Sequence, residues 1–373
     1  MLTRLEARDF RNLEPLTWSP GPGRHLLLGG NGAGKSSLLE AVYTAATTRS
    51  FRTPRLGECV RHGRSAFRLA AEVEDAARTR LEVSWATAGL ERTVNGSRAT
   101  LAEHLEVLRV VAWTSAEVEV LTGPPARRRR FMDRGVVTAR PGALESLRRY
   151  RTALRQKRDL LALADPDRQA AAGADGARDG SLSAWNRVLA EAAAEVSHLR
   201  SRYVEDLEQA LEGVLRQVDL PFPPIALRYR PSPSCAPEGA AAIEERLERA
   251  APSELRRGMP LLGSHRDELE IVWGGHPVSQ VASAGETKAL SVALLAAHGR
   301  TVERSGKTPI YLLDDLDAEL APETLAAVWI VFGAAEQVVA SSNRPAVWEG
   351  LAVDSRWNLR KGRIEGASAS LTH

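Results

Sequence analysis

A glycine-rich loop near the N-terminus constrains the fold of this chain more than any other feature. Within "HLLLGGNGAGKSSLLEAVYTAA", Gly29, Gly34, Lys35 and Ser36 match the phosphate-loop pattern GxxxxGK[ST], after the apolar run 26–28 and before a helical pattern. Glycines let successive backbone N–H groups point at phosphate oxygens, and the following helix turns its positive dipole end toward them. We therefore expect Lys35 to contact the β and γ phosphates of a nucleotide and Ser36 to ligate Mg²⁺.

An acidic pair in the C-terminal third predicts the other half of such a site. The apolar strand pattern 310–313 ends in Asp314 and Asp315, and α/β sheets gather their ligands at the carboxyl ends of strands. Asp314 would hold Mg²⁺ together with Ser36, and Asp315 would orient or deprotonate the attacking water. Two aspartates that only cap the next helix are the alternative. Because the two motifs lie so far apart, a large insertion must separate them.

The distribution of apolar residues divides the 373-residue chain into three regions, as expected for a length that exceeds one compact core. Residues 1–121 read as short strands around the helix after the phosphate loop, with "VNGSR" as a hairpin turn. Residues 122–258 carry helical spacing and one strand at "PIALRYR", and the Ala/Gly/Asp-rich stretch 165–180 predicts a mobile segment. Strands and helices alternate again in 259–373. We expect an α/β head with a mixed sheet, split by an inserted helical arm.

Basic residues concentrate at the start of the predicted arm. The net charge is only +3, but residues 123–160 contain twelve Arg or Lys against three Asp or Glu. Arg148, Arg151 and Arg155 share one face of a predicted helix, and four arginines precede them: Arg127, Arg128, Arg129 and Arg130. Cationic side chains that neutralise phosphates release counterions and bind any sequence, so we predict that these arginines contact DNA. A solvated helix face is the alternative.

A third motif precedes the acidic pair. The sequence "SAGETKALSVALLAAHG" puts Ser283 and Gly285 at the start of a helix, with Glu286 three residues after the serine. This spacing is an ordinary capping box, and it also resembles the signature motif of ABC-type ATPases, whose usual form is LSGGQ. In that superfamily the signature of one subunit closes over the γ phosphate held by the other. The resemblance implies a homodimer that ATP assembles.

Seven motifs occur in the order and approximate spacing of the RecF family of bacterial recombination mediators: "ARDFRNL", "GGNGAGKSSLLEAVY", "RSFRTP", "LTGPPARRRRFMDRG", "LLGSHRDELEI", "SAGETKAL" and "LLDDLDAEL". The resemblance implies an ABC-type P-loop ATPase head without the long coiled coil of SMC proteins. It also implies ATP-dependent dimerisation on double-stranded and gapped DNA, weak DNA-stimulated ATP hydrolysis, and cooperation with RecR and RecO in placing RecA on single-stranded DNA.

The resemblance also assigns site residues. Around ATP it places Arg11, Asn12, Gly29, Gly30, Asn31, Gly32, Ala33, Gly34, Lys35, Ser36 and Ser37, and from the opposite subunit Ser283, Gly285 and Glu286. The catalytic residues would be Lys35, Asp315 and Ser283. The chain departs from the usual pattern at five positions, where the signature Gln is Glu286, the Walker B Glu is Asp315, the D-loop acid is Ala321, the switch His is Asn343 and Glu117 would take the place of the Q-loop Gln. A shorter base and a missing histidine predict slow hydrolysis.

Other functions fit parts of the sequence. A transporter-type or SMC-type ATPase subunit would use the same nucleotide motifs, although a transporter subunit has no use for a basic arm. A DNA clamp would use ATP mainly to hold the dimer together. Cys59 and Cys235 form no disulfide framework, the N-terminus carries no targeting segment, and no apolar run approaches the roughly 20 residues of a membrane span. We therefore expect a cytoplasmic protein without membrane contact.

Overall fold

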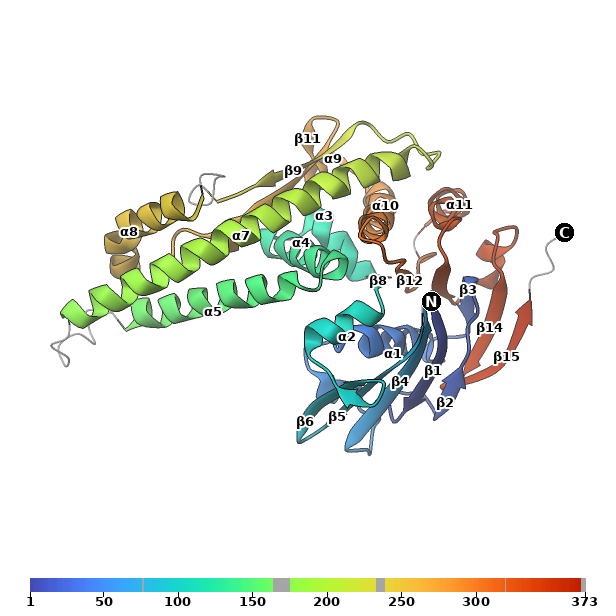
Figure 1. The fold of residues 1–373 in the computed structure, drawn as a ribbon. Helices are drawn as coiled ribbons and strands as arrows, with labels where there is room; N and C mark the ends of the chain where they lie inside the picture. The colour runs from blue at the N-terminus through green and yellow to red at the C-terminus, as the bar shows by residue number, and fades with distance from the viewer. Residues whose placement is uncertain (76, 164–174, 233–238, 319, 370–373) are drawn as a thin grey trace. The chain divides into compact units, whose positions relative to one another are not determined.

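The computed structural model describes residues 1–75, 77–163, 175–232, 239–318 and 320–369, which form two compact units (Figure 1). Unit 1 comprises Met1–Thr122, Gln209–Pro223 and Val278–His373, and unit 2 comprises Gly123–Glu208 and Pro224–Pro277. These bounds differ from those of the predicted domains 1–121, 122–258 and 259–373. The reason is that β10 (Glu268–Trp273) pairs with β9 (Ile225–Arg230) inside unit 2, while the last residues of helix α7 belong to unit 1.

A mixed six-stranded sheet in unit 1 has the strand order β15-β14-β3-β13-β12-β8. Its first five strands in chain order run parallel, and β15 closes the edge as the antiparallel partner of β14. The strands are β3 (Gly23–Leu28), β8 (Val110–Trp113), β12 (Ile310–Leu313), β13 (Gln337–Ser342), β14 (Ser355–Arg360) and β15 (Arg363–Ala369). β12 and β13 are buried along their whole length, so apolar and polar residues do not alternate along them as they do in a strand with one exposed face. The predicted mixed sheet is confirmed.

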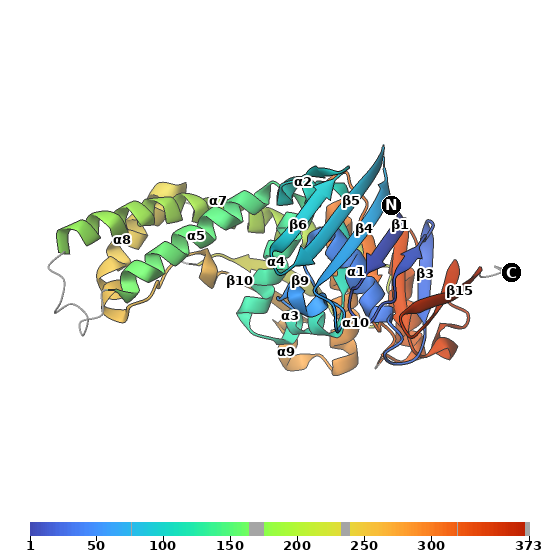
Figure 2. The ribbon, with the colours of Figure 1, turned by 90° about the horizontal axis from the view of Figure 1, so that it is seen from below.

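A second six-stranded sheet in unit 1 is antiparallel and has the order β2-β1-β4-β5-β6-β7 (Figure 2). The strands are β1 (Leu2–Arg8), β2 (Leu16–Trp18), β4 (Ala66–Glu74), β5 (Arg78–Ala86), β6 (Gly89–Val94) and β7 (Ser97–Arg98). Apolar residues alternate along β4 and β5, so one face packs on the core and the other carries charged side chains. The predicted "VNGSR" turn is confirmed, with Asn95 and Gly96 both at positive φ.

Helix α1 (Lys35–Thr47) is the central helix of unit 1. Eleven of its residues are buried, and Leu38 and Val42 share one apolar core with Leu5 of β1 and Leu69 of β4. The other helices of this unit are η1 (Leu56–Cys59), α2 (Leu101–Val107), η2 (Ser115–Val118), α3 (Glu119–Thr122), α9 (Val278–Val281), α10 (Ala284–Glu303), α11 (Pro322–Trp329), η5 (Ile330–Phe332) and η6 (Pro345–Trp348). This core fixes the start of α1, where the phosphate loop ends.

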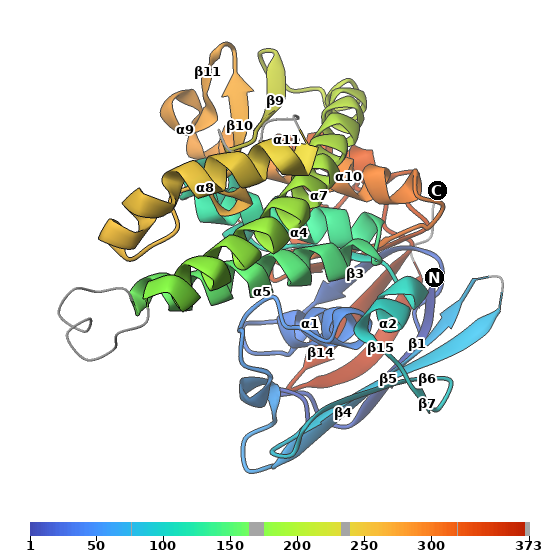
Figure 3. The same ribbon diagram turned by 60° about the vertical axis from the view of Figure 1, so that its left-hand side comes forward.

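Unit 2 contains long helices and a small sheet of order β11-β10-β9, with β11 at His276–Pro277 (Figure 3). The helices are α4 (Pro125–Ala139), α5 (Ala143–Ala162), α7 (Asp175–Leu215), η4 (Ser264–Arg266) and α8 (Gly239–Arg257). α5, α7 and α8 contribute Leu147, Leu189 and Leu247 to one core, which confirms the predicted helical periodicity of this region. Most of the segment predicted to be mobile, 165–174, lies outside the described residues. No helix in the described part of the chain is long and apolar enough to cross a bilayer.

Candidate functional site

The phosphate loop connects β3 to α1 in unit 1. Gly34 is the N-cap of α1 at φ +109, a left-handed conformation that favours glycine, and no side chain caps the helix. The first N–H groups of α1 therefore face no capping oxygen, as in helix termini that bind phosphate. Lys35 bends back over the loop, and its ammonium donates hydrogen bonds to the carbonyls of Gly29 at 2.8 Å and Gly30 at 3.2 Å. The local geometry fits the phosphates of a nucleotide.

Two predicted site residues support the loop from the side. Asn12 donates from Nδ2 to the Gly32 carbonyl at 2.8 Å and accepts from the Ser37 hydroxyl at 2.7 Å. Arg11 instead pairs with the fully buried Glu40, at 2.6 Å from Nη2 and 2.9 Å from Nε. The structure therefore brings Asn12 and Ser37 to the loop, while the Arg11 guanidinium is engaged by a carboxylate of α1. Direct phosphate contact by these residues stays a prediction.

The predicted metal ligands come together from distant parts of the chain. The Ser36 side chain lies near Asp314, and Ser341 donates to Asp314 Oδ1 at 2.8 Å. Burial raises the pKa of Asp314, and the hydrogen bonds from Ser341 and Ser36 only partly oppose this shift. Among the residues described, no three His, Cys, Asp or Glu side chains cluster closely enough to hold a metal by themselves. Ser36 and Asp314 offer the hard oxygen ligands that Mg²⁺ prefers when phosphate and water complete its shell.

Asp315 follows at the carboxyl end of β12. Its side chain is exposed and its φ is +47, a conformation that costs a non-glycine residue energy but that Asp tolerates better than most. Its N–H donates to Ser341 Oγ at 2.9 Å, so one serine holds both aspartates of the pair. The proposed role of Asp315 as base stays a prediction.

The segment after β13 connects two parts of the site, a role that was not predicted apart from the placement of Asn343. Ser342 donates to the buried Asp317 at 2.8 Å, and Arg344 donates to the Asp317 carbonyl at 2.9 Å. Asn343, predicted in place of the switch histidine, donates to Asn31 of the phosphate loop at 3.1 Å. The segment therefore links the phosphate loop with the chain after β12. Polar residues directly after a buried strand were the available signal.

The predicted capping box at the signature motif is confirmed. Ser283 caps α10, with its hydroxyl accepting from the Glu286 N–H at 3.3 Å while Glu286 accepts from the Ser283 N–H at 2.8 Å. Hydrogen bonds to the Glu286 carboxylate from the Ser283 hydroxyl and from the Ser283 N–H lower the pKa of Glu286. Ser283, Gly285 and Glu286 are all exposed. Their predicted action on the nucleotide of another subunit stays a prediction, as does the role of Glu117 in η2.

The signature helix α10 also contains a buried lysine that was not among the predicted site residues. Lys288 of α10 donates to the Ala318 carbonyl, and its ammonium lies 5.2 Å from the centre of the Trp113 ring. Trp113 in turn donates to Ser291 at 3.0 Å. The signature helix is therefore tied to the end of β8 and to the segment that follows β12.

The four consecutive arginines of α4, which are predicted to contact DNA, are not equivalent in the structure, and their contact with DNA stays a prediction. Arg128 forms a two-pronged ion pair with Glu268 at 2.6 and 3.1 Å. Arg129 donates to the Asp267 carbonyl at 3.0 Å, and burial lowers its pKa. Arg127 is half-buried, and Arg130 is exposed. Each side chain lies on a different side of the helix, because successive residues turn by about 100°.

The arginines predicted on one face of α5 do share an exposed face. Arg148, Arg151 and Arg155 are exposed, and Arg151 donates to Asp133 at 3.0 Å. This confirms their predicted arrangement on the helix. Contact with DNA stays a prediction.

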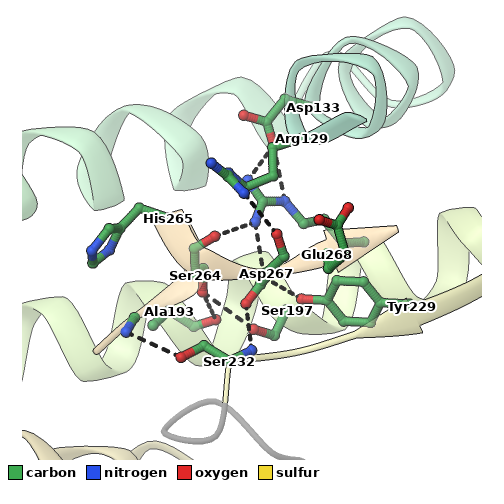
Figure 4. Close-up of polar contacts among 12 residues, drawn as sticks. Arg129, Asp133, Ala193, Ser197, Tyr229, Ser232, Ser264, His265, Asp267 and Glu268 are labelled. Carbon is green, nitrogen blue, oxygen red and sulfur yellow. Dashed lines mark hydrogen bonds and ion pairs between the residues drawn. The ribbon is translucent and has the colours of Figure 1, made fainter. Parts of the chain in front are cut away.

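The arginine-rich motif and "GSHRDEL" contribute side chains to one polar network, in which Asp133, Ser264 and Asp267 lie close together (Figure 4). The buried guanidinium of Arg200 in α7 donates to Asp133 of α4 at 2.8 and 3.0 Å, to Asp267 at 2.8 Å and to the Ser264 carbonyl at 2.6 Å. Burial raises the pKa of Asp267, which Arg200 and Tyr229 oppose. Both motifs therefore contribute carboxylates to one buried ion-pair network inside unit 2.

A family model and curated relatives that are similar to this chain all point to one family. The family described as "RecF/RecN/SMC N terminal domain" matches residues 1–353. The "DNA replication and repair protein RecF" of Anaeromyxobacter sp. (strain Fw109-5) is 32% identical over 86% of this chain and 86% of its own length. The same-named protein of Frankia alni is 30% identical over 98% of this chain and 100% of its own.

Two solved structures share the fold. That of the recombination mediator protein RecF with ATP, in the RecFOR pathway, has a TM-score of 0.85 at 21% identity and covers 99% of this chain and 97% of that one. That of an Smc head bound to the C-winged helix domain of ScpA has a TM-score of 0.55 at 14% identity, over 99% and 98%. The predicted ABC-type head architecture is therefore confirmed.

Proposed function

This chain belongs to the RecF family of DNA replication and repair proteins, and on that premise we propose that it is an ATP-dependent recombination mediator acting on duplex DNA beside single-stranded gaps. One observation carries the proposal: Ser36 and Asp314, from distant parts of the chain, come together next to a loop over which the Lys35 ammonium is already bent. These are the phosphate-binding and metal-binding groups that an ATPase needs.

ATP and Mg²⁺ fit the residues present. Lys35 and the N–H groups at the start of α1, which no side chain caps, would bind the phosphates, and Ser36 with Asp314 would hold Mg²⁺, which neutralises phosphate charge when bound. Asp315, exposed at the end of β12, would accept a proton from the attacking water. Its carboxylate reaches less far than that of a glutamate, and Asn343 carries no titratable ring. Hydrolysis is therefore expected to be slow.

ATP would also assemble the homodimer. The N-terminus of α10 is exposed with Ser283 and Gly285, and its dipole would favour the γ phosphate held by a second subunit. Glu286 is bound to the cap, so we expect it to position Ser283 rather than touch the nucleotide.

The exposed arginines of unit 2 would contact the DNA backbone. Arg148 and Arg155 are the strongest candidates, since Arg128 and Arg129 are held inside the unit by Glu268 and the Asp267 carbonyl. Arg151 would have to exchange Asp133 for a phosphate. These contacts read charge and not sequence, as expected of a protein that acts at any gap. We further propose that the protein cooperates with RecR and RecO in loading RecA, and that it does so in a reducing cytosol.

A DNA clamp that hydrolyses ATP only rarely is a second candidate, favoured by Asp315 and Asn343 standing where the family usually has Glu and His. Single-turnover hydrolysis on DNA separates the two: release of phosphate within the lifetime of the complex supports the mediator, and its absence supports the clamp.

The test combines size-exclusion chromatography with DNA binding. We expect a dimer with ATP and a monomer with ADP, and binding of gapped duplex DNA only by the ATP form. The double variant Arg148→Ala, Arg155→Ala should reduce the slope of log K against log salt by about 1.8, at about 0.9 per lost phosphate contact. A matched control is Arg216→Ala, Arg249→Ala, which removes two exposed arginines from surface pairs and should leave the slope unchanged. Equal slopes in all three proteins would move the DNA contact away from α5.

A further inference from the structure

The last hairpin of unit 1 touches the phosphate loop through its backbone. β14 and β15 are joined by a two-residue turn, Lys361 and Gly362, at φ +48 and +76. The Gly362 N–H donates to the Ala33 carbonyl in the loop at 2.8 Å, and the Gly362 carbonyl accepts from the Glu14 N–H at 3.0 Å. One residue at the tip of the hairpin, Gly362, thus joins the loop to the segment that carries Asn12.

The contact leaves no room for a side chain. A Cβ at Gly362 would lie 2.1 Å from the Asn12 carbonyl oxygen and 3.0 Å from the Glu14 nitrogen, both of which are backbone atoms. The hairpin also approaches both ends of the loop: a Cβ on Gly29 would meet the Leu359 carbonyl at 2.4 Å, and one on Gly34 would lie 3.2 Å from Gly362 Cα. A two-residue hairpin turn needs positive φ but none of these contacts. They therefore serve the loop and not the hairpin.

The contact with Gly362 helps to set which way the peptide groups of the phosphate loop point. Phosphate binding requires that the loop N–H groups point inward, which requires its carbonyls to point outward and to find partners. Gly362 provides such a partner for Ala33, and Asn12 provides one for Gly32. A loop held this way before the nucleotide arrives loses less conformational entropy on binding.

We propose that the β14–β15 turn is a positioning element for the phosphate loop, with Gly362 as its key residue, so that affinity for the triphosphate depends on a hairpin near the C-terminus. This inference rests on the proposed binding of ATP. The turn acts through the loop and touches no reacting atom. Its exposed cations, Arg360, Lys361 and Arg363, are not part of the mechanism, because the contacts are made by backbone atoms.

The test compares two glycine variants. Gly362→Ala should raise the dissociation constant about tenfold for a fluorescent ATP analogue, and by the same factor for inorganic tripolyphosphate, since one buried backbone hydrogen bond and the loop order it maintains are lost. Gly350→Ala is the matched control: Gly350 also lies in unit 1 at positive φ, +79, with nothing within 4 Å of its Cβ position. It carries the same backbone strain and should change affinity less than twofold. Lys361→Ala should also stay within twofold.

The outcomes separate the inference from the proposed function. If the parent binds ATP and Gly362→Ala binds equally well, or if Lys361→Ala loses as much as Gly362→Ala, the positioning role is wrong and ATP binding stands. If the parent binds neither ATP nor tripolyphosphate, the positioning role and the proposed binding of ATP are both wrong. Hydrogen exchange on the unmodified protein covers the case in which Gly362→Ala does not fold. Adding the ATP analogue should slow exchange at residues 360–363 together with 29–36, and protection of the loop alone would overturn the proposal.

Discussion

Replacing Arg200 with methionine should destabilise unit 2 severely, because the substitution leaves two carboxylates without their buried partner. The Arg200 side chain is 4% exposed, and its partners Asp133 and Asp267 are 14% and 0% exposed. Removing one member of a buried ion pair costs about 3–5 kcal/mol. Asp267 keeps its hydrogen bonds from Tyr229 and the Ser232 N–H, so we expect the lower end, about 3 kcal/mol.

A matched control removes an exposed arginine from the same carboxylate. Arg151 also pairs with Asp133, but the Arg151 side chain is 53% exposed. Because exposed ion pairs contribute only about 0–1 kcal/mol to the free energy of unfolding, Arg151→Met should cost little. Adding Asp267→Asn to Arg200→Met should recover part of the lost stability, since a neutral amide costs less to bury than an unpaired carboxylate. Urea unfolding followed by circular dichroism gives the free energies, and hydrogen exchange in β10 assigns the loss to unit 2.

The stability cost of Arg200→Met should depend on pH, and the protonation of Asp267 sets the sign of this dependence. Burial already raises the pKa of Asp267 in the folded protein, and loss of Arg200 removes the charge that opposes this shift. The variant therefore binds a proton more readily when folded than when unfolded, and its penalty should shrink as the pH falls toward that raised pKa. A cost of Arg200→Met within 1 kcal/mol of that of Arg151→Met, or a penalty that grows on acidification, would refute the reasoning.

Three further predictions concern the nucleotide site. Lys35→Ala should abolish ATP binding in calorimetry, whereas Asp315→Asn should bind ATP and release phosphate more slowly; a parental rate would exclude Asp315 as base. Because burial raises the pKa of Asp314, protons should compete with Mg²⁺ at a higher pH than they would at an ordinary Asp, so Mg²⁺-dependent ATP binding should weaken on acidification more in the parent than in Asp314→Asn. Mixing inactive Lys35→Ala with inactive Ser283→Arg should restore part of the ATPase, because one site of the heterodimer is intact; background activity despite verified subunit exchange would contradict the shared site.

Local patterns predicted the parts of the fold that are built from contiguous residues. The phosphate loop, the strand ending in Asp314 and Asp315, and the capping box at Ser283 each depend on backbone conformations that a few neighbouring residues specify. The same holds for the exposed face of α5, whose arginines recur at helical spacing. Such features could be predicted because their physics is local.

Pairing between distant segments could not be predicted in this way. Nothing in the run of four arginines shows that Glu268 and the Asp267 carbonyl hold two of them, since those partners lie at and directly before the start of β10, far along the chain. The bounds of the two units follow from the pairing of β9 with β10, and β9 lies outside the predicted C-terminal region. The amino-acid sequence by itself determined which groups could bind phosphate and metal. Only the tertiary structure decided that Ser36 meets Asp314, that Arg200 joins two motifs and that Gly362 supports Ala33, because these contacts depend on sheet order and core packing.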